Sequence, residues 1–389
     1  MASVQEIARL SPIENSDFLE IAEMKNLGWK VVVKKGEFKP GDKVVYFEID
    51  SAIEVKNLAD GLKFLAEKGT KKLFTGRTPD TSAFSGEYVR IKTIKLRGQV
   101  SQGLIVPAIV KGSHNCAHAP IGFDVTNLFQ VEVWDRLVEW YDERSQLGPK
   151  AQSHAAGTFP EWCPKTDEVR IEGLMEYFSD PEMTNAVWEC TEKNDGSSQT
   201  LFYCPEKWPD DPMKTASRKF LLKDDGCSDD WFNVFKKIGW DLLKKRFETI
   251  YKNGFEYVDD TTKAIVEFPK NHELAVQSEH IGAKFNGNHD RNTEDHVRVF
   301  RIFDVTDQKF VSPNCRYEIC RILGLEHVKV IETCKIFDKC KTIDDFENYV
   351  TRKSDNGNQI EGVVFKRVDN GEISFKKVSA KYLLGNEKD

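Results

Sequence analysis

Short runs of apolar and β-branched residues, separated by turn formers, dominate about the first 125 residues of the chain. Four such runs occupy 28–33, 43–49, 88–92 and 101–107, and Pro40-Gly41-Asp42 separates the first two. Many short strands between Gly and Pro turns are typical of a small β-barrel, and an OB-fold is the leading candidate. Such barrels commonly hold nucleic acid, so we expect an OB-like nucleic-acid-binding domain over residues 1–130.

The pattern changes after residue 130. Residues 131–141 place Trp134, Leu137, Val138 and Tyr141 on one side of a predicted short helix, and a polar stretch from 142 to 157 reads as a linker. We place the boundary near residue 145, with a helix and linker at 131–157 and a second domain at 158–389.

Strands and helices alternate in the second part. One helix is predicted after Ser228, with an apolar stripe that includes Leu242 and an end near Asn253-Gly254. Another is predicted after Thr342, with Phe346, Tyr349 and Val350 as its stripe. Strands are predicted at 275–279, 297–305, 361–366 and 373–378. The fold class is therefore α+β.

Composition narrows the class of protein. The chain of 389 residues is 40% apolar and carries a net charge of −7, which indicates a folded protein without a general affinity for nucleic acid. No stretch approaches the roughly 20 apolar residues of a membrane span. The nine cysteines are scattered and odd in number, as in a reducing compartment. We expect an intracellular monomer, cytoplasmic or nuclear, with no membrane contact.

The candidate chemistry begins at Lys193-Asn194-Asp195-Gly196. A lysine, one residue, then Asp-Gly at a strand end is the pattern of enzymes that hold a nucleotide covalently. An amine attacks phosphorus only when unprotonated, so we expect desolvation or positive charge to lower the pKa of this lysine. Taken alone, the four residues are equally compatible with a solvated turn that has Asp-Gly at its tip.

Further charged and aromatic residues follow in order along the predicted strands. A carboxylate ends the strand at 275–279, an aromatic residue precedes Asp304, a carboxylate leads the strand at 361–366, and two lysines lie on the last strand. These residues are Glu279, Phe303, Glu361, Lys376 and Lys377. Strand alternation sends the two lysines to opposite faces, so only one can reach a phosphate, and Lys376 is the first choice.

These five segments resemble, in order and spacing, the motifs of the covalent nucleotidyltransferases, the superfamily of ATP-dependent ligases and mRNA capping enzymes. Upstream, Phe159-Pro160 and the run from Pro164 to Arg170 resemble the segment before the nucleophile in RNA ligases. The overall match is with the RNA ligase 5 family, in which an OB domain precedes an ATP-grasp-like ligase domain of antiparallel sheets and helices. The resemblance covers nearly the whole chain.

The resemblance implies a role for each position. Lys193 would attack the α-phosphate of ATP and carry AMP. Asp195, Glu279 and Glu361 would hold Mg²⁺ or Mn²⁺, for which carboxylate oxygens are suited, although Glu279 could instead bind ribose. Phe303 would stack on adenine, and Lys376 or Lys377 would neutralise phosphate. Arg170 would grip the nucleotide or the 5′-phosphate of the nucleic acid, and the ATP site would also include Glu192 and Gly196.

Two observations qualify the resemblance. Ser278 stands where the family has Gly before the glutamate, and a Cβ there is expected to crowd the ribose. Only residues 379–389 follow the last motif, too few for the OB domain that DNA ligases and capping enzymes carry at that point.

We therefore expect an ATP-dependent RNA ligase that repairs RNA ends, including nicked duplex. The alternatives are a DNA ligase, a capping-type enzyme, or a catalytically silent RNA-binding relative. For contact with nucleic acid in the front domain we expect four cations: Arg90, Lys92, Lys95 and Arg97.

Overall fold

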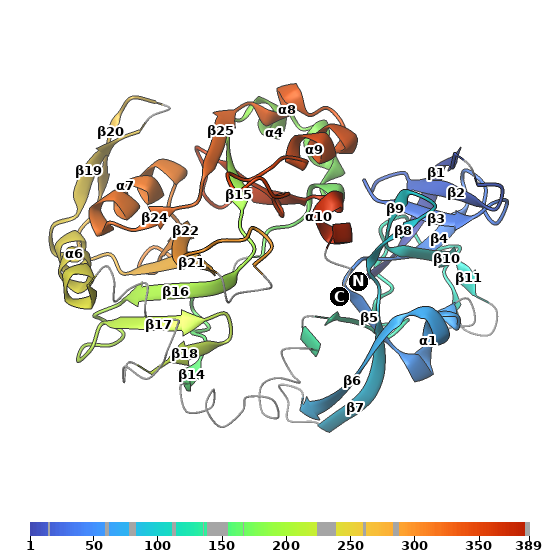
Figure 1. Cartoon of the computed structure of the whole chain (residues 1–389), viewed down its shortest axis with the longest axis horizontal. Helices are drawn as coiled ribbons and strands as arrows, with labels where there is room; N and C mark the ends of the chain where they lie inside the picture. Colours follow the sequence, from blue (N-terminus) through green and yellow to red (C-terminus); the bar gives the residue numbers. More distant parts are fainter. Residues whose placement is uncertain are drawn as a thin grey trace. The chain divides into compact units, whose positions relative to one another are not determined.

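The computed structural model describes residues 1–14, 16–58, 62–77, 83–110, 114–134, 136–137, 155–165, 167–223, 239–259, 262–282 and 288–385. The chain forms two compact units (Figure 1). The first contains Met1–Lys150 with Glu172–Met175 and Leu383–Asp389, and the second contains Ala151–Ile171 and Glu176–Tyr382.

The first unit is built mainly of strands. One sheet has the order β10-β4-β1-β2-β3 and a second has the order β13-β5-β7-β6, while β8 and β9 form a separate hairpin. The strand bounds are β1 Ala2–Pro12, β2 Leu19–Met24, β3 Lys30–Lys34, β4 Lys43–Phe47, β5 Ser51–Glu54, β6 Thr70–Arg77, β7 Ala83–Arg90, β8 Thr93–Leu96, β9 Gln99–Gln102, β10 Leu104–Pro107 and β13 Val131–Val133. The short elements are η1 Val55–Asn57, α1 Leu65–Lys68, β11 Ile109–Val110 and β12 His114–Asn115.

The predicted strands of this unit are present, but one of the predicted runs forms two strands instead of one. The run 101–107 is two strands, because Gly103 has φ +97° and a Cβ there would approach Tyr46 Cε2 to 2.4 Å. Val45, Phe47 and Val106 lie in the core between the sheets. The OB-like, β-rich character of the front of the chain is confirmed.

The helix predicted at 131–141 is wrong at its start. Val131–Val133 is strand β13, which pairs antiparallel with β5, because two β-branched residues meet a free strand edge there. Trp134 and Leu137 are buried beside Phe74, and residues 138–141 lie outside the described part. The predicted linker also falls mostly outside it, but Ala155–Thr158 is strand β14.

The second unit contains two main antiparallel sheets (Figure 1). The larger has the order β14-β18-β17-β16-β21-β22-β23, with β24 beside β22, and the smaller has the order β25-β15-β26-β27. The bounds are β15 Trp188–Lys193, β16 Ser197–Tyr203, β17 Met213–Ser217, β18 Phe220–Leu222, β21 Leu274–Ile281, β22 His296–Asp304, β23 Lys309–Phe310, β24 Glu326–His327, β25 Val330–Cys334, β26 Gly362–Arg367 and β27 Ser374–Val378. A hairpin of β19 Phe255–Val258 and β20 Ile265–Phe268 completes the strands.

Helices cover the outer face of each sheet. Side chains of α6 Trp240–Asn253 and α7 Pro313–Leu323 pack on the larger sheet. Rings of α8 Ile336–Lys339 and α9 Ile343–Val350 pack against Trp188, Phe365 and Phe375 of the smaller sheet. The remaining helical turns are η3 Ile171–Gly173, η4 Met175–Phe178, α4 Pro181–Asn185 and α10 Ala380–Gly385.

Two helix predictions can be compared with these elements. Thr342 caps α9 in a capping box with Asp345, as its sequence predicts. Helix α6 ends at Gly254 as predicted, but its predicted start at 228–238 lies outside the described residues. The predicted stripe is wrong at Leu242, which is 47% exposed; the buried stripe is Leu243, Phe247 and Ile250.

The α+β class and the antiparallel sheets with helices in the second unit are confirmed. Among the helices that the structure describes, none has the length and apolar character that crossing a membrane requires.

Candidate active site

Lys193 lies at the end of β15, on the face of the smaller sheet that is turned away from α8 and α9. Its cross-strand partner is Gly362, which places the side chain of the preceding Glu361 within reach. Lys193 Nζ donates a hydrogen bond to Glu361 Oε1 at 2.6 Å, and both side chains are mostly buried. The lysine and the carboxylate, separated by most of the unit in sequence, therefore form one ion pair.

The charge around Lys193 differs from the sequence expectation. Desolvation alone would lower the pKa of Lys193, but Glu361, Glu279 and Glu168 raise it, and the net direction is upward. The expected lowering of the pKa of Lys193 is therefore wrong, because the neighbouring carboxylates outweigh the effect of burial. Burial and the nearby carboxylates raise the pKa of Glu279 to about 8.

Asp195 is held from two directions. Tyr382 of α10 donates a hydrogen bond to Asp195 Oδ2, and His289 Nε2 lies 3.8 Å from the same oxygen. The next residue, Gly196, approaches the neighbouring strand so closely that a Cβ would lie 2.3 Å from the His280 carbonyl oxygen. Any larger residue there would displace the turn that carries Asp195.

The two motif lysines lie on opposite faces of β27. Lys376 pairs with Asp167, on the same face as Lys193. Lys377 is 2% exposed and pairs with Glu347 of α9 at 2.7 Å, on the face that packs against the helices. The structure thus gives Lys377 a buried ion pair away from the candidate site, and only Lys376 of the two lysines lies on the face of Lys193.

The segment before the nucleophile runs along β27. Arg170 forms a parallel bridge with Lys376, and Lys376 N donates to the Val169 carbonyl at 2.9 Å. Arg170 is therefore brought beside Lys376. This backbone pairing explains how residues at opposite ends of the unit reach one site.

Three other predicted positions have mixed placements. Phe303 is 4% exposed and packs edge-on against Phe310 at 5.1 Å. Glu192 is buried on the opposite face from Lys193, where burial raises its pKa. Ser278 Oγ donates to the Gln199 carbonyl at 3.0 Å, and strand alternation turns its Cβ away from the face of Glu279. The expected crowding of a ribose by Ser278 is therefore wrong.

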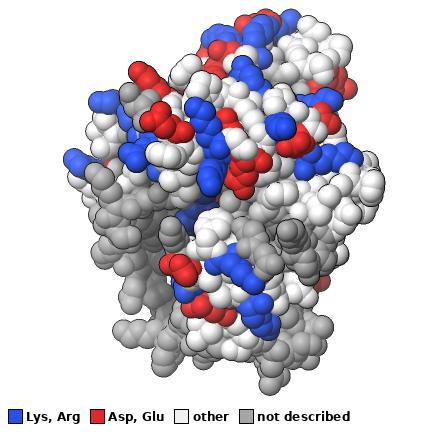
Figure 2. All heavy atoms as spheres, turned by 90° about the vertical axis from the view of Figure 1, so that its right-hand side faces the viewer, with Lys and Arg blue, Asp and Glu red and all other residues white. Residues whose placement is uncertain are grey.

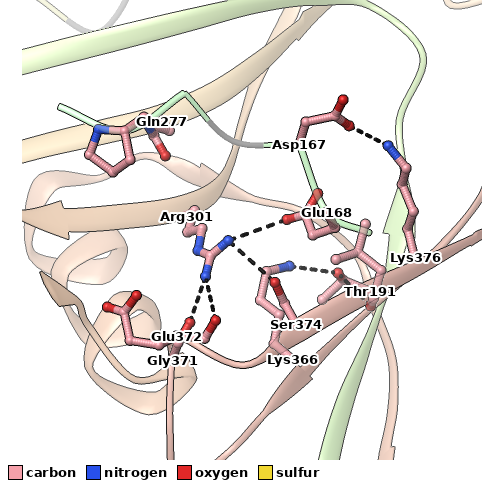
Figure 3. Close-up of polar contacts among 12 residues, drawn as sticks. Asp167, Glu168, Thr191, Gln277, Arg301, Lys366, Gly371, Glu372, Ser374 and Lys376 are labelled. Carbon is pink, nitrogen blue, oxygen red and sulfur yellow. Dashed lines mark hydrogen bonds and ion pairs between the residues drawn. The ribbon is translucent and has the colours of Figure 1, made fainter. Parts of the chain in front are cut away.

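Several polar residues at the inner end of the site were not predicted (Figure 3). Lys366 is buried, donates to Thr191 Oγ1 at 3.2 Å, and burial beside Arg316 lowers its pKa to about 7. Arg301 lies 3.6 Å from Glu168 and donates to the Gly371 carbonyl at 2.8 Å. Strand alternation places Lys366 on the face of Lys193, and Arg301 pairs with Gln277 on the face of Glu279. The residues next to them in sequence do not mark either one as part of the site.

A third missed cation is Arg218, in the turn between β17 and β18. It is exposed, and its charge acts to lower the pKa of both Asp167 and Glu279, so it lies near both.

A cavity beside Asp167 and Glu168 has a volume of about 250 Å³. Its lining residues are Lys165, Asp167, Glu168, Val169, Arg301, Phe310, Glu372 and Ser374.

The carboxylates fit a divalent cation. Glu361 Oε2 is buried without a hydrogen-bond partner in the described part of the chain, although Oε1 is bound to Lys193. Asp195 and Glu361 both raise the pKa of Glu279, so the three carboxylates are neighbours. Clustered hard oxygen ligands with an unsatisfied lone pair are what Mg²⁺ and Mn²⁺ require.

The predicted nucleic-acid contacts in the first unit fall into two groups. Arg90 Nη2 pairs with Asp50 at 2.6 Å and its guanidinium lies over Trp134, so it stabilises the unit itself. Lys92 is half-buried, whereas Lys95 and Arg97 are exposed on the β8–β9 hairpin. On the face in Figure 2, Lys and Arg are interspersed with Asp and Glu, so a local contact fits better than a broad basic surface.

Comparison with known proteins agrees with this arrangement. A family model described as an OB-fold domain matches residues 1–108, and one described as RNA ligase matches residues 186–383. No curated protein is similar enough in sequence to match the chain.

Solved structures of Naegleria gruberi RNA ligase match over nearly both whole chains. A mutant with AMP and Mn is 25% identical, with 100% of this chain and 99% of that chain covered and a TM-score of 0.74. A mutant with ATP and Mn is 25% identical, with 98% of each chain covered and a TM-score of 0.73. The same ligase with pyrophosphate is 26% identical, with 100% and 98% covered and a TM-score of 0.72. The chain belongs to the RNA ligase family and has an OB-fold domain before its ligase domain.

Proposed function

We propose that this RNA ligase is ATP-dependent and works through AMP bound covalently to Lys193. The observation that carries the proposal is the ion pair of Lys193 with Glu361 in a site that also contains Asp195 and Glu279. The similarity to ligase structures solved with ATP, AMP and Mn supports it. The chain would act as a monomer on RNA ends, including nicks in duplex RNA.

In the first step, Lys193 Nζ attacks the α-phosphorus of ATP. The N–P bond forms as the bond to the bridging oxygen breaks, and pyrophosphate leaves. Nζ must lose a proton before it can attack, and Glu361 Oε1 already accepts an N–H from it. Lys376 would neutralise the α-phosphate, and its pairing with Asp167 would be exchanged for the nucleotide.

Asp195, Glu279 and Glu361 would hold the divalent cation. When bound, a cation there would offset their negative charge, favour the unprotonated lysine and stabilise charge on the phosphates. The exposed Arg218 and the bridged Arg170 would bind the remaining phosphates of ATP or the RNA 5′-phosphate.

In the later steps, AMP moves from Lys193 to the RNA 5′-phosphate, and a 3′-OH displaces it. Lys193 has no role in the last step. The Lys193→Ala variant should therefore fail to join 5′-phosphate RNA with ATP but still join RNA that already carries a 5′-adenylate. Failure on both substrates in a folded variant would contradict the proposal.

The substrate is tested with nicked duplexes that differ only in the sugar at the 3′-OH side. We expect sealing when this sugar is ribose and much slower sealing when it is deoxyribose. Equal sealing of an all-DNA nick would favour a DNA ligase. No sealing of any nick, together with intact RNA binding, would favour a silent relative.

A further inference from the structure

Gln277 and Arg301 are cross-strand partners on β21 and β22. Gln277 precedes Glu279 by two residues and so shares its face of the larger sheet. Both residues are nearly fully buried, at 3% and 7% exposure. Figure 3 shows Gln277 and Arg301 on one side of the view and Thr191 and Lys366 of the smaller sheet on the other.

The amide of Gln277 is fixed in one orientation. Its Nε2 donates to the Pro164 carbonyl at 2.7 Å and lies 3.8 Å from Cys163 Sγ. Because the nitrogen is held by a carbonyl, which only accepts, the oxygen must take the other position. That oxygen, Oε1, is buried without a hydrogen-bond partner among the described residues.

Arg301 presents the complementary group. Nη2 donates to the Gly371 carbonyl at 2.8 Å, Nη1 lies 3.3 Å from Ser374 Oγ, and the guanidinium lies 3.6 Å from the centre of the Phe310 ring. These contacts fix the guanidinium plane. Its Nε–H is buried without an acceptor in the described part of the chain.

Two cross-strand partners thus carry, among the described residues, a buried acceptor and a buried donor that are both without a hydrogen-bond partner. Buried polar groups without partners cost free energy, and a ligand that supplies the missing partners recovers it. Adenine offers an exocyclic amino donor next to a ring-nitrogen acceptor. Guanine offers a carbonyl oxygen at the same position, which would face Gln277 Oε1 as a second acceptor.

We propose that Gln277, held by Pro164 and paired with Arg301, selects adenine over guanine in the nucleotide that reacts with Lys193. This inference rests on the proposed function, since it assumes that the nucleotide enters this site. Gln277 Oε1 would accept from the amino group of adenine, and Arg301 Nε would donate to the neighbouring ring nitrogen. A freely rotating amide would accept either base, so the Pro164 contact is part of the selectivity.

The test measures the rate of lysyl-nucleotide formation with three α-labelled nucleotides. ATP, GTP and purine riboside triphosphate, which lacks the 6-amino group, are compared in the wild-type protein and in Gln277→Met, which keeps the length of the side chain without an acceptor. Gln5→Met is the matched control, because Gln5 is also a buried glutamine whose Oε1 has no hydrogen-bond partner among the described residues, but it lies in the first unit.

We expect the wild-type protein to use ATP about 10- to 100-fold faster than purine riboside triphosphate, a difference of about 1.4–2.7 kcal/mol. Gln277→Met should lose this advantage and be no slower than wild type with purine riboside triphosphate. The variant removes the acceptor and the analogue removes the donor of the same hydrogen bond, so their effects should not add. Its ATP-to-GTP ratio should fall, whereas Gln5→Met should keep both ratios.

Two results would overturn the inference. One is equal use of ATP and purine riboside triphosphate by the wild-type protein, which needs no variant. The other is an equal loss of rate with all three nucleotides in Gln277→Met. Absence of any lysyl-nucleotide in the wild-type protein would instead contradict the proposed function, so the two failures are distinguishable.

Discussion

Lys193 Nζ lies 2.6 Å from Glu361 Oε1, and this contact keeps the candidate nucleophile protonated in the free protein. Glu361 is the first of the carboxylates that raise the pKa of Lys193 against the effect of its burial. Under the proposed mechanism, the pair would keep the amine unreactive until a bound cation offsets the charge of the carboxylates. Glu361 would therefore have two opposite effects on the reaction: it keeps Lys193 protonated, and it supplies a ligand for the cation. Variants can separate these two effects.

The Glu361→Gln variant should make Lys193 react faster at a given pH with small amine-reactive reagents, while nearly abolishing its reaction with ATP. Loss of the carboxylate lowers the pKa of the lysine, but it also removes a ligand for the cation. We expect lysyl-AMP formation to fall by about 10²-fold or more, the usual effect of removing an electrostatic group from a reacting site. Reagent labelling of Lys193 as a function of pH, with the site located by peptide mapping, measures the first effect.

Glu318→Gln serves as the control, because Glu318 lies away from Lys193 in α7 and pairs with the exposed Arg321. It should leave both the labelling profile and the ATP reaction unchanged. A labelling profile in Glu361→Gln that moves to higher pH would contradict the role assigned to the pair.

Glu279→Gln should stabilise the protein, but only at high pH. The pKa of Glu279 is raised to about 8 in the folded state, so the folded state holds its proton more tightly than the unfolded chain between about pH 4.5 and 8. Because of Glu279, the free energy of unfolding therefore decreases as the pH rises through that range. We expect a gain of about 1–3 kcal/mol at pH 8.5, typical of relieving an uncompensated buried group, and little gain at pH 4.5.

Urea unfolding at the two pH values measures this difference. An equal gain at both would show that Glu279 is not the group responsible. The same variant should lose activity with ATP, since it removes an expected ligand for metal or ribose.

Lys376 and Lys377 should differ in kind when each is replaced by Met. Lys376→Met should lose lysyl-AMP formation with little change in stability, because its partner Asp167 is exposed. Lys377→Met should lose about 3 kcal/mol of stability, since it leaves Glu347 unpaired, and adding Glu347→Gln should restore part of it. Thermal unfolding and nucleotide labelling of the three proteins distinguish the roles; loss of labelling in a fully folded Lys377→Met would contradict them.

The hairpin formed by β8 and β9 should contribute to RNA affinity without affecting the reaction with ATP. Replacing Lys95 and Arg97 by Ala removes two exposed cations, so the slope of log affinity against log salt should become shallower by about 1–2. Lys341→Ala, an exposed change in the second unit, should leave the slope unchanged. An unaltered slope in the double variant would place the RNA contact elsewhere.

Much of the site could be predicted because side chains alternate between the two faces of a strand, so the face of each residue relative to its neighbours follows from the sequence. Order along the chain and alternation along β27 were enough to separate Lys376 from Lys377. The α9 cap was equally local, since Thr342 and Asp345 satisfy each other within one helical turn. Gly196, just before β16, and Gly362, the first residue of β26, lie where neighbouring backbone excludes any Cβ.

The features that were missed depend on distant partners. Val131–Val133 became a strand because the edge of β5 was available to pair with it. The pKa of Lys193 depends on Glu279 and Glu361, which are far from it in sequence. Both features are set by tertiary contacts, which local patterns do not contain. The error at Ser278 is different, because alternation along β21 already places it on the face opposite Glu279.

The most direct test of the account is transfer of label from α-labelled ATP to the protein in the presence of Mg²⁺ or Mn²⁺. The account predicts one labelled band on a denaturing gel, with release of pyrophosphate, an acid-labile and base-stable bond as expected of a phosphoramidate, and loss of the label in Lys193→Ala. Absence of a labelled band in the wild-type protein, or a band that persists in Lys193→Ala, would contradict it.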